Sequence, residues 1–271
     1  MTVSKSLSGF IVLQNSDFDR YPVVEAIESV AQLCDEIVLL LPDADAFAEQ
    51  VLRDIHYENF RPFYEQSGAS HAERIQFAIS QCRGDWLFHL QPDEVLHDEY
   101  LPIIQNALDK YANDASIDAL VFSHRHFFGS YRFCHPASKK FYEKEIRLMK
   151  KGSDLVPTSD GRTVLRVDGM QPTSIEVDAE MYHYAFVPPP NRVEIPTEFT
   201  TLRYPARADA DPASVFVAET GTSLFRFTGT HPTVMTRRIV HSEIDFQPKE
   251  ILMERKGDSP VQKFLRACEK L

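Results

Sequence analysis

The fold is decided by the stretch Gly84-Asp85-Trp86-Leu87-Phe88-His89-Leu90-Gln91-Pro92-Asp93-Glu94-Val95-Leu96, where an apolar run ends at a proline and two carboxylates follow. Only His89 interrupts that apolar run, which is typical of a strand buried on both faces. Pro92 cannot donate a hydrogen bond to a neighbouring strand and therefore marks the strand end. Asp93 and Glu94 are then expected at the carboxyl edge of a sheet, where ligands bind in open α/β folds.

The two carboxylates also have a structural alternative, because acidic side chains stabilise helix N-termini. A helix is expected over residues 98–111, directly after them. The stretch alone does not separate a ligand site from a helix cap, so the choice rests on the segments around it.

The chain before this stretch alternates between strands and helices. Short β-type runs lie at residues 9–13, 37–41 and, more weakly, within 59–65. Apolar residues at helical spacing predict helices over residues 22–34, 47–55 and 70–82. Such alternation is the signature of a parallel, doubly wound sheet with right-handed crossovers. No Gly-rich phosphate loop follows the first strand, which disfavours dinucleotide-binding dehydrogenases and P-loop enzymes.

The chain after residue 123 is rich in β-formers and turns instead. Strands are expected at residues 119–123, 144–150, 163–167 and 181–186, before the rigid stop Pro188-Pro189-Pro190. Beyond it we expect a short strand near residues 225–227 and a surface helix over 260–271. We therefore predict an α/β fold with one domain over residues 1–190, a parallel half (1–123) and a β-rich half (124–190). We expect residues 191–271 to form an irregular C-terminal extension packed on the same domain.

Composition and charge exclude several classes of protein. The 271 residues are 43% hydrophobic and 25% charged, which is ordinary globular material. The net charge of -11 argues against a nucleic-acid partner, which requires a basic surface. No apolar run approaches the ~20 residues of a membrane-spanning helix, and the first residues lack the core of a signal peptide, so we expect a cytoplasmic protein. The four cysteines form no CxxC pair and indicate neither a zinc ribbon nor a disulfide framework.

One stretch opposes the acidic trend. Residues 125–151 carry eight Lys or Arg residues against two glutamates. A local positive excess would suit a phosphate-bearing ligand or acceptor. The alternative is that these side chains lie on solvated strand faces and in a loop.

The order of short motifs resembles a known family. Gly84-Asp85-Trp86 and Leu90-Gln91-Pro92-Asp93-Glu94 are similar to the acidic signature of bacterial family-two glycosyltransferases with a GT-A fold. Further matching pieces are Gly9-Phe10-Ile11, Asn15, Tyr21-Pro22, Asp35-Glu36-Ile37-Val38, Phe127-Phe128-Gly129-Ser130-Tyr131, Glu145-Ile146-Arg147-Leu148, Tyr182-His183-Tyr184 and Gly229-Thr230-His231-Pro232. The resemblance implies a GT-A-like domain with a nucleotide-sugar-binding half and an acceptor half. It further implies sugar transfer from a nucleotide-sugar donor to a carbohydrate or lipid-linked acceptor in surface polysaccharide synthesis.

The resemblance also implies a metal site. Asp93, with Glu94, is expected to hold a divalent ion, Mn or Mg, because carboxylate oxygens suit such ions. His183 is expected as a third ligand; its alternative is a hydrogen-bonded core histidine. The family's DxD motif has an aspartate where this chain has Gln91, which leaves Asp93 as the main ligand.

The remaining roles concern the substrates. Asp160, in Ser159-Asp160-Gly161, is expected as the general base that takes the acceptor proton in an inverting transfer, with Asp168 and Glu176 as rivals. Asn15 and Asp43, in turns after the first two strands, are candidates for nucleoside contacts, and Arg147 for the diphosphate or an anionic acceptor.

Three alternatives stay open. A catalytically silent homologue that binds a sugar or a partner is compatible with Gln91. A nucleotidyltransferase shares this kind of sheet but normally has a Gly-rich basic loop after the first strand, where this chain has Gln14-Asn15-Ser16-Asp17. A zinc site at His124, His126, Cys134 and His135 has no common zinc spacing.

Overall fold

The computed structural model describes residues 6–14, 17–42, 52–53, 55, 57–64, 68–134, 144–159, 161, 163–187 and 225–242. Its first part contains β1 (Leu7–Val12), α1 (Asp17–Arg20), α2 (Val23–Val30), β2 (Glu36–Leu41), β3 (Phe60–Tyr64), α4 (His71–Gln81) and β4 (Trp86–Leu90). The second part contains β5 (Glu94–Leu96), the 3-10 helix η1 (Asp98–Tyr100), α5 (Leu101–Tyr111), β6 (Ala119–Phe128), β7 (Ser130–Cys134), β8 (Lys144–Lys150), β9 (Leu155–Pro157), β10 (Val164–Arg166) and β11 (Ser174–Phe186). A C-terminal segment, residues 225–242, contains β12 (Phe225–Arg226), η2 (Thr233–Met235) and α8 (Thr236–Val240).

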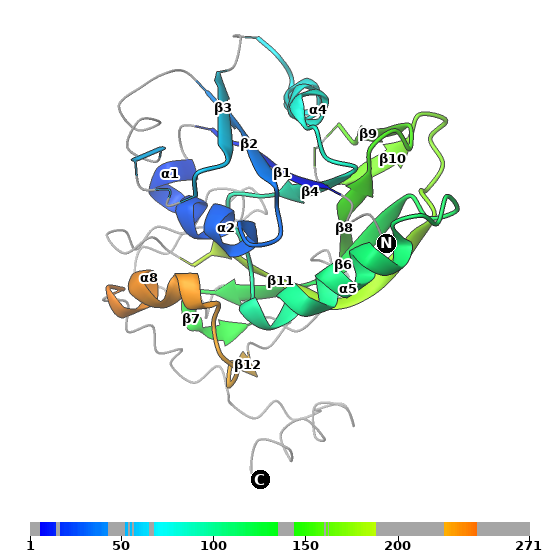
Figure 1. The fold of residues 1–271 in the computed structure, drawn as a ribbon. Coiled ribbons are helices and arrows are strands. Elements are labelled where there is room, and N and C mark those ends of the chain that lie inside the picture. Colours follow the sequence, from blue (N-terminus) through cyan, green and yellow to red (C-terminus); the bar gives the residue numbers. More distant parts are fainter. Residues whose placement is uncertain are drawn as a thin grey trace, which may run out of the picture.

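Four parallel strands in the order β4-β1-β2-β3 form the first half of the sheet (Figure 1). Every residue of β1, β2 and β4 is buried, because helices cover both faces. Ile27 of α2 and Ile104 of α5 share a core with Phe88, whereas Ile75 of α4 packs in a second core with Phe10. The doubly wound α/β class expected from the sequence is therefore confirmed.

The second half continues the same sheet with mostly antiparallel pairs. β8 pairs with β4 and β6, and β6 pairs with β7, all antiparallel. β11 lies parallel to β6 and antiparallel to the short β5. Because β5 follows β4 after only three residues, this pairing ties the end of β4 to β11. The β-rich half predicted after residue 123 is confirmed.

The predicted element boundaries agree best where burial is two-sided. The strands at 86–90 and 144–150 match β4 and β8, and the helix over 70–82 is α4, which Ser70 and Glu73 cap reciprocally. β11 instead begins at Ser174, seven residues before the predicted start. Its first half alternates exposed and buried side chains and so lacked a continuous apolar run. The helix predicted over 260–271 and most of that over 47–55 lie outside the described residues.

The C-terminal segment packs against the second half through an aromatic cluster. His231 lies at its centre, with Nδ1 2.8 Å from the Tyr184 hydroxyl and Nε2 2.9 Å from the Tyr131 carbonyl oxygen. Burial lowers the pKa of His231 to about 4, so the ring is neutral at pH 7. Arg238 of α8 forms an ion pair with Glu25 of α2, 2.8 Å apart. The division into a domain at 1–190 and an extension at 191–271 stays a prediction.

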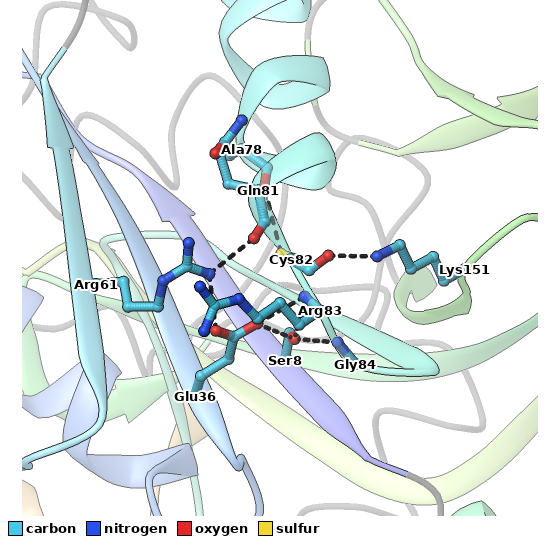
Figure 2. Close-up of polar contacts among 9 residues, drawn as sticks. All are labelled: Ser8, Glu36, Arg61, Ala78, Gln81, Cys82, Arg83, Gly84 and Lys151. Carbon is cyan, nitrogen blue, oxygen red and sulfur yellow. Dashed lines mark hydrogen bonds and ion pairs between the residues drawn. The ribbon is translucent and has the colours of Figure 1, made fainter.

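A polar network joins the strands at their amino ends (Figure 2). Glu36 accepts hydrogen bonds from the Ser8 hydroxyl and the Arg83 backbone N–H, both at 2.7 Å, and pairs with Arg61 at 2.8 Å. Burial acts to raise the pKa of Glu36, but these hydrogen bonds outweigh it and the pKa is lowered. The Ser8 oxygen also accepts from the Gly84 N–H at 2.7 Å. The network fixes the turn before β4 against β1 and β2.

Gly84→Ala is expected to lower the free energy of unfolding by about 2–3 kcal/mol, because the added carbon overpacks this turn. A Cβ there would lie 2.5 Å from the Ser8 backbone nitrogen, which cannot move without breaking the β1–β4 pairing. Urea unfolding measures the effect. Gly152→Ala is the control: its site is open at a φ of +85°, so only backbone strain of about 1 kcal/mol is expected. Equal costs for the two variants would contradict the steric argument.

Among the helices of the described residues, none has the length and apolar character needed to cross a membrane.

Candidate functional site

A cleft of about 230 Å³ opens at the carboxyl ends of β1 and β4. Its wall is made by the ends of both strands, by α1 and by the first residue of α4, and its lining residues are Val12, Gln14, Asp17, Arg20, Tyr21, His71, His89, Leu90, Gln91, Pro92 and Asp93. This is the edge at which open α/β sheets bind ligands. Of the acidic pair expected at this edge, Asp93 lines the cleft and Glu94 does not.

Asp93 lines this cleft. Its side chain is 12% exposed, and Oδ1 is buried with no hydrogen-bond partner among the described residues. Oδ2 lies 3.5 Å from Nε2 of His183. The Asp93 backbone oxygen accepts a hydrogen bond from the Tyr184 N–H at 2.8 Å, which fixes it to β11. A buried carboxylate oxygen without a partner is costly unless a ligand supplies one.

Strand register brings His183 to Asp93. His183 of β11 lies opposite Glu94 of β5 on one side and His126 of β6 on the other. Nδ1 of His183 is 3.0 Å from Nδ1 of His126. That hydrogen bond orients the ring so that Nε2 points toward the carboxylate.

Glu94 and Arg147 are paired with each other. Arg147 donates from Nε and Nη2 to the two Glu94 oxygens at 2.7 and 2.8 Å, and both side chains are 0% exposed. Nε2 of His124 lies 3.1 Å from Glu94 Oε1. Burial acts to raise the pKa of Glu94, but Arg147 and His124 hold it well below its usual range. Neither Glu94 nor Arg147 lines the cleft, and their roles toward a metal and a diphosphate stay predictions.

The other predicted site residues are distributed differently. Asn15, Asp43 and Asp160 lie outside the described residues. The backbone of Gly161, the residue after Asp160, packs against the cleft residue His71, since a Cβ on Gly161 would lie 2.3 Å from the imidazole Cδ2. Of the rivals for the base, Asp168 accepts from the Met170 N–H in an exposed turn. The other rival, Glu176, pairs with Lys144 at 2.6 Å.

Most of the basic stretch is engaged within the protein. Arg125 pairs with Glu180 at 2.6 Å, Lys144 with Glu176, and Lys151 donates to the Cys82 carbonyl oxygen at 2.5 Å. Lys150 donates to the Asp114 carbonyl oxygen and lies over the Trp86 ring. A location on strand faces therefore describes these residues better than a phosphate site.

A wider cleft of about 490 Å³ lies at the opposite, amino edge of the parallel strands. Its acidic lining residues include Asp35 and Glu36. Asp35 accepts from the Leu7 N–H at 2.8 Å, and Glu36 belongs to the network of Figure 2. These carboxylates hold strands together, so we place the functional site at the carboxyl edge.

Asp17 is a cleft residue that sequence reasoning missed. Its side chain is 7% exposed, and Oδ2 accepts from the Gln14 N–H at 2.7 Å. Burial, with the charge of Asp93 as a smaller cause, raises the pKa of Asp17 to about 6 despite that hydrogen bond and the nearby Arg20 and Arg74. Its position in a polar turn after the first strand was the only signal that could have found it.

Asp17→Asn should become more stable relative to the wild type as the pH rises from 4 to 7. The native pKa of about 6 exceeds the ordinary value of 3.8, so the folded state holds the proton more tightly. That stabilisation is fully present below pH 3.8 and is lost through pH 6, a change of about 3 kcal/mol. Urea unfolding of both proteins at pH 4, 5.5 and 7 measures the difference. Parallel pH profiles for the two proteins would contradict the raised pKa.

Within the described residues, no group of three or more His, Cys, Asp or Glu side chains could hold a metal ion. Asp93 and His183 offer two ligands of suitable type. Mg²⁺ is usually held by one or two carboxylates together with substrate phosphates and water, so Asp93 Oδ1, which has no partner in the described part of the chain, fits a site completed by a ligand.

Comparisons with known proteins give structural likenesses only. No protein-family model and no curated protein matches the sequence. TarS of S. aureus is 13% identical over 66% of this chain and 60% of its own crystallised chain, with a TM-score of 0.42. Glucosyl-3-phosphoglycerate synthase from Mycobacterium tuberculosis, crystallised with Mn²⁺, UDP and phosphoglyceric acid, is 12% identical over 45% of this chain and 43% of its own, with a TM-score of 0.34. The 4-diphosphocytidyl-2C-methyl-D-erythritol synthase from Anaerococcus prevotii is 15% identical over 55% and 72%, with a TM-score of 0.37.

Proposed function

We propose that this protein is a glycosyltransferase that moves a sugar from a nucleotide-sugar donor to an acceptor hydroxyl. The observation that carries the proposal is Asp93 in a cleft at the carboxyl edge of a parallel sheet, with a buried Oδ1 that has no hydrogen-bond partner among the described residues. The acidic motif that resembles family-two glycosyltransferases ends at this residue and its neighbour. The acceptor is a carbohydrate or lipid-linked intermediate of surface polysaccharide synthesis, handled in the cytoplasm, and no nucleic acid is involved.

The proposed reaction is a single displacement that inverts the anomeric carbon. The acceptor oxygen forms a bond to that carbon, and the bond from the carbon to the diphosphate oxygen breaks, so the nucleoside diphosphate leaves with the electron pair. Asp160 takes the acceptor proton. Support for this role comes from Gly161, which lies against His71 in the cleft wall.

The chain's own residues then have defined tasks around the leaving group. Asp93 and His183 would hold the divalent ion, and His126 orients His183. Such an ion, Mn or Mg, neutralises charge on the departing diphosphate. In this proposal Glu94 and Arg147 act as a buried ion pair behind the site, which holds β5 against β8.

The test is a panel of nucleotide-sugars incubated with the full chain and Mn²⁺. One donor should release its nucleoside diphosphate, and the same nucleotide should raise the melting temperature. Addition of EDTA should abolish the release. The proposal fails if no donor is hydrolysed or transferred and no nucleotide is bound.

A catalytically silent binding protein is the second candidate, favoured by Gln91 in the cleft wall where the family has an aspartate. It predicts a melting-temperature shift without release of the diphosphate. A nucleotidyltransferase would instead release pyrophosphate from a nucleoside triphosphate and a sugar phosphate, which the same panel detects once it is extended to those substrates.

A further inference from the structure

His89 is a buried histidine in the lining of the cleft. It lies in β4, and the residue is 4% exposed. Nδ1 is buried and has no hydrogen-bond partner among the described residues. Nothing in the proposed reaction uses this residue, and the described part of the fold gains no hydrogen bond from Nδ1.

The ring is held in a fixed orientation. His89 lies opposite Phe10 in the β1–β4 register, and the two rings stack with centroids 4.8 Å apart and planes 5° apart. Phe10 is itself 0% exposed. Because the imidazole is stacked on a buried phenyl ring, its orientation toward a ligand in the cleft is fixed.

The charge state of the ring limits what it recognises. Burial, with a smaller contribution from Arg147, lowers the pKa of His89 to about 3, so the ring is neutral at pH 7. A neutral imidazole offers one N–H donor and one lone pair. The donor and the lone pair of a neutral imidazole can hydrogen-bond a hydroxyl or carbonyl group, whereas a cation binds a diphosphate more strongly.

The neighbouring lining residues have the same preference. Asp17 and Asp93 present carboxylate oxygens, and Gln14 and Gln91 present amides, all in the cleft wall. Carboxylates accept hydrogen bonds from hydroxyl groups, and amides both donate and accept them. The lining therefore suits a ring that carries hydroxyl groups.

We infer that His89 is a specificity-determining residue that hydrogen-bonds an uncharged hydroxyl-bearing ring of the donor, the ribose or the sugar. The inference rests on the proposed function, since it takes this cleft as the donor site. His89 contacts a part of the donor that carries no negative charge, and it thereby selects which donor is bound.

The test uses His89→Phe, which keeps a ring for stacking on Phe10 and removes both nitrogens. The ligand-free variant should melt at the wild-type temperature or higher, because a buried nitrogen without a partner has been removed. Affinity for the nucleoside diphosphate or donor that binds best in the panel should fall about tenfold or more. Affinity for inorganic diphosphate with Mn²⁺ should not change. Calorimetry at a temperature where all proteins are folded measures the two affinities, and a thermal scan measures the melting temperature.

His97→Phe is the matched control, since His97 is also buried but lies outside the cleft lining and bonds Thr230 at 3.0 Å. It should show the opposite pattern, a lower melting temperature with unchanged nucleotide affinity. If the wild type binds nucleotide and His89→Phe binds it equally well, this inference is wrong while the proposed function stands. If the wild type binds no nucleotide or donor, both fail. A loss of inorganic diphosphate binding in His89→Phe would overturn the hydroxyl assignment.

Discussion

Asp93→Asn is expected to reduce nucleoside diphosphate release on the order of 10²- to 10³-fold while the protein remains folded. The substitution removes the negative charge of the cleft carboxylate whose Oδ1 has no partner among the described residues. It leaves the backbone hydrogen bond from Tyr184 in place, so the link from the end of β4 to β11 should persist. Release rates at saturating donor, measured across a series of Mn²⁺ concentrations, should show both a lower maximum and a weaker dependence on the metal.

Asp85→Asn is the control for that experiment. Asp85 lies just before the same strand at its opposite end, where it bonds Ser6 at 3.1 Å. It should retain the wild-type rate and Mn²⁺ dependence. An Asp93→Asn protein with wild-type rate and metal dependence would remove the basis for placing the reaction at this edge.

Arg147→Met is expected to lower the free energy of unfolding by about 3–5 kcal/mol, the usual cost of leaving one member of a buried ion pair alone. In this variant Glu94 would remain 0% exposed. His124, whose Nε2 lies 3.1 Å from Glu94, would be left to compensate the carboxylate charge. Glu94→Gln should also destabilise, because it leaves a buried guanidinium opposite a neutral amide. Urea unfolding at pH 7 measures both variants.

The double variant Glu94→Gln/Arg147→Met separates the ion pair from other effects. Because it removes both charges together, its loss should be clearly smaller than the sum of the two single losses. Additive losses would show that the two side chains stabilise the fold independently. A stable Arg147→Met protein that fails to bind nucleotide would support the original expectation that Arg147 contacts the substrate.

The parallel half is well predicted from the sequence because its signal is local. The run from Trp86 to Leu90 is apolar except for His89, and a capping serine marks the start of α4. The first half of β11 escapes the same reasoning, since its outward side chains are polar.

The site is less accessible to sequence reasoning because its geometry depends on pairings between distant strands. Glu94 and Arg147 are 53 residues apart, and each has the residue type that a ligand site would also use. The pairings of β5 with β11 and of β8 with β4 and β6 bring their side chains together. The stacking of His89 on Phe10 likewise depends on strand register. The sequence did show that His89 is the one polar residue in an apolar strand.

The aromatic cluster around His231 has a consequence for how this chain folds. The contact between His231 and Tyr131 spans 100 residues, whereas β1 and β2 pair with registers only 28 residues apart, as between Ser8 and Glu36. Closing so long a loop costs entropy and slows formation of the contact. The pairing of β1 with β2 is therefore expected to form before residues 225–242 close over Tyr131 and Tyr184.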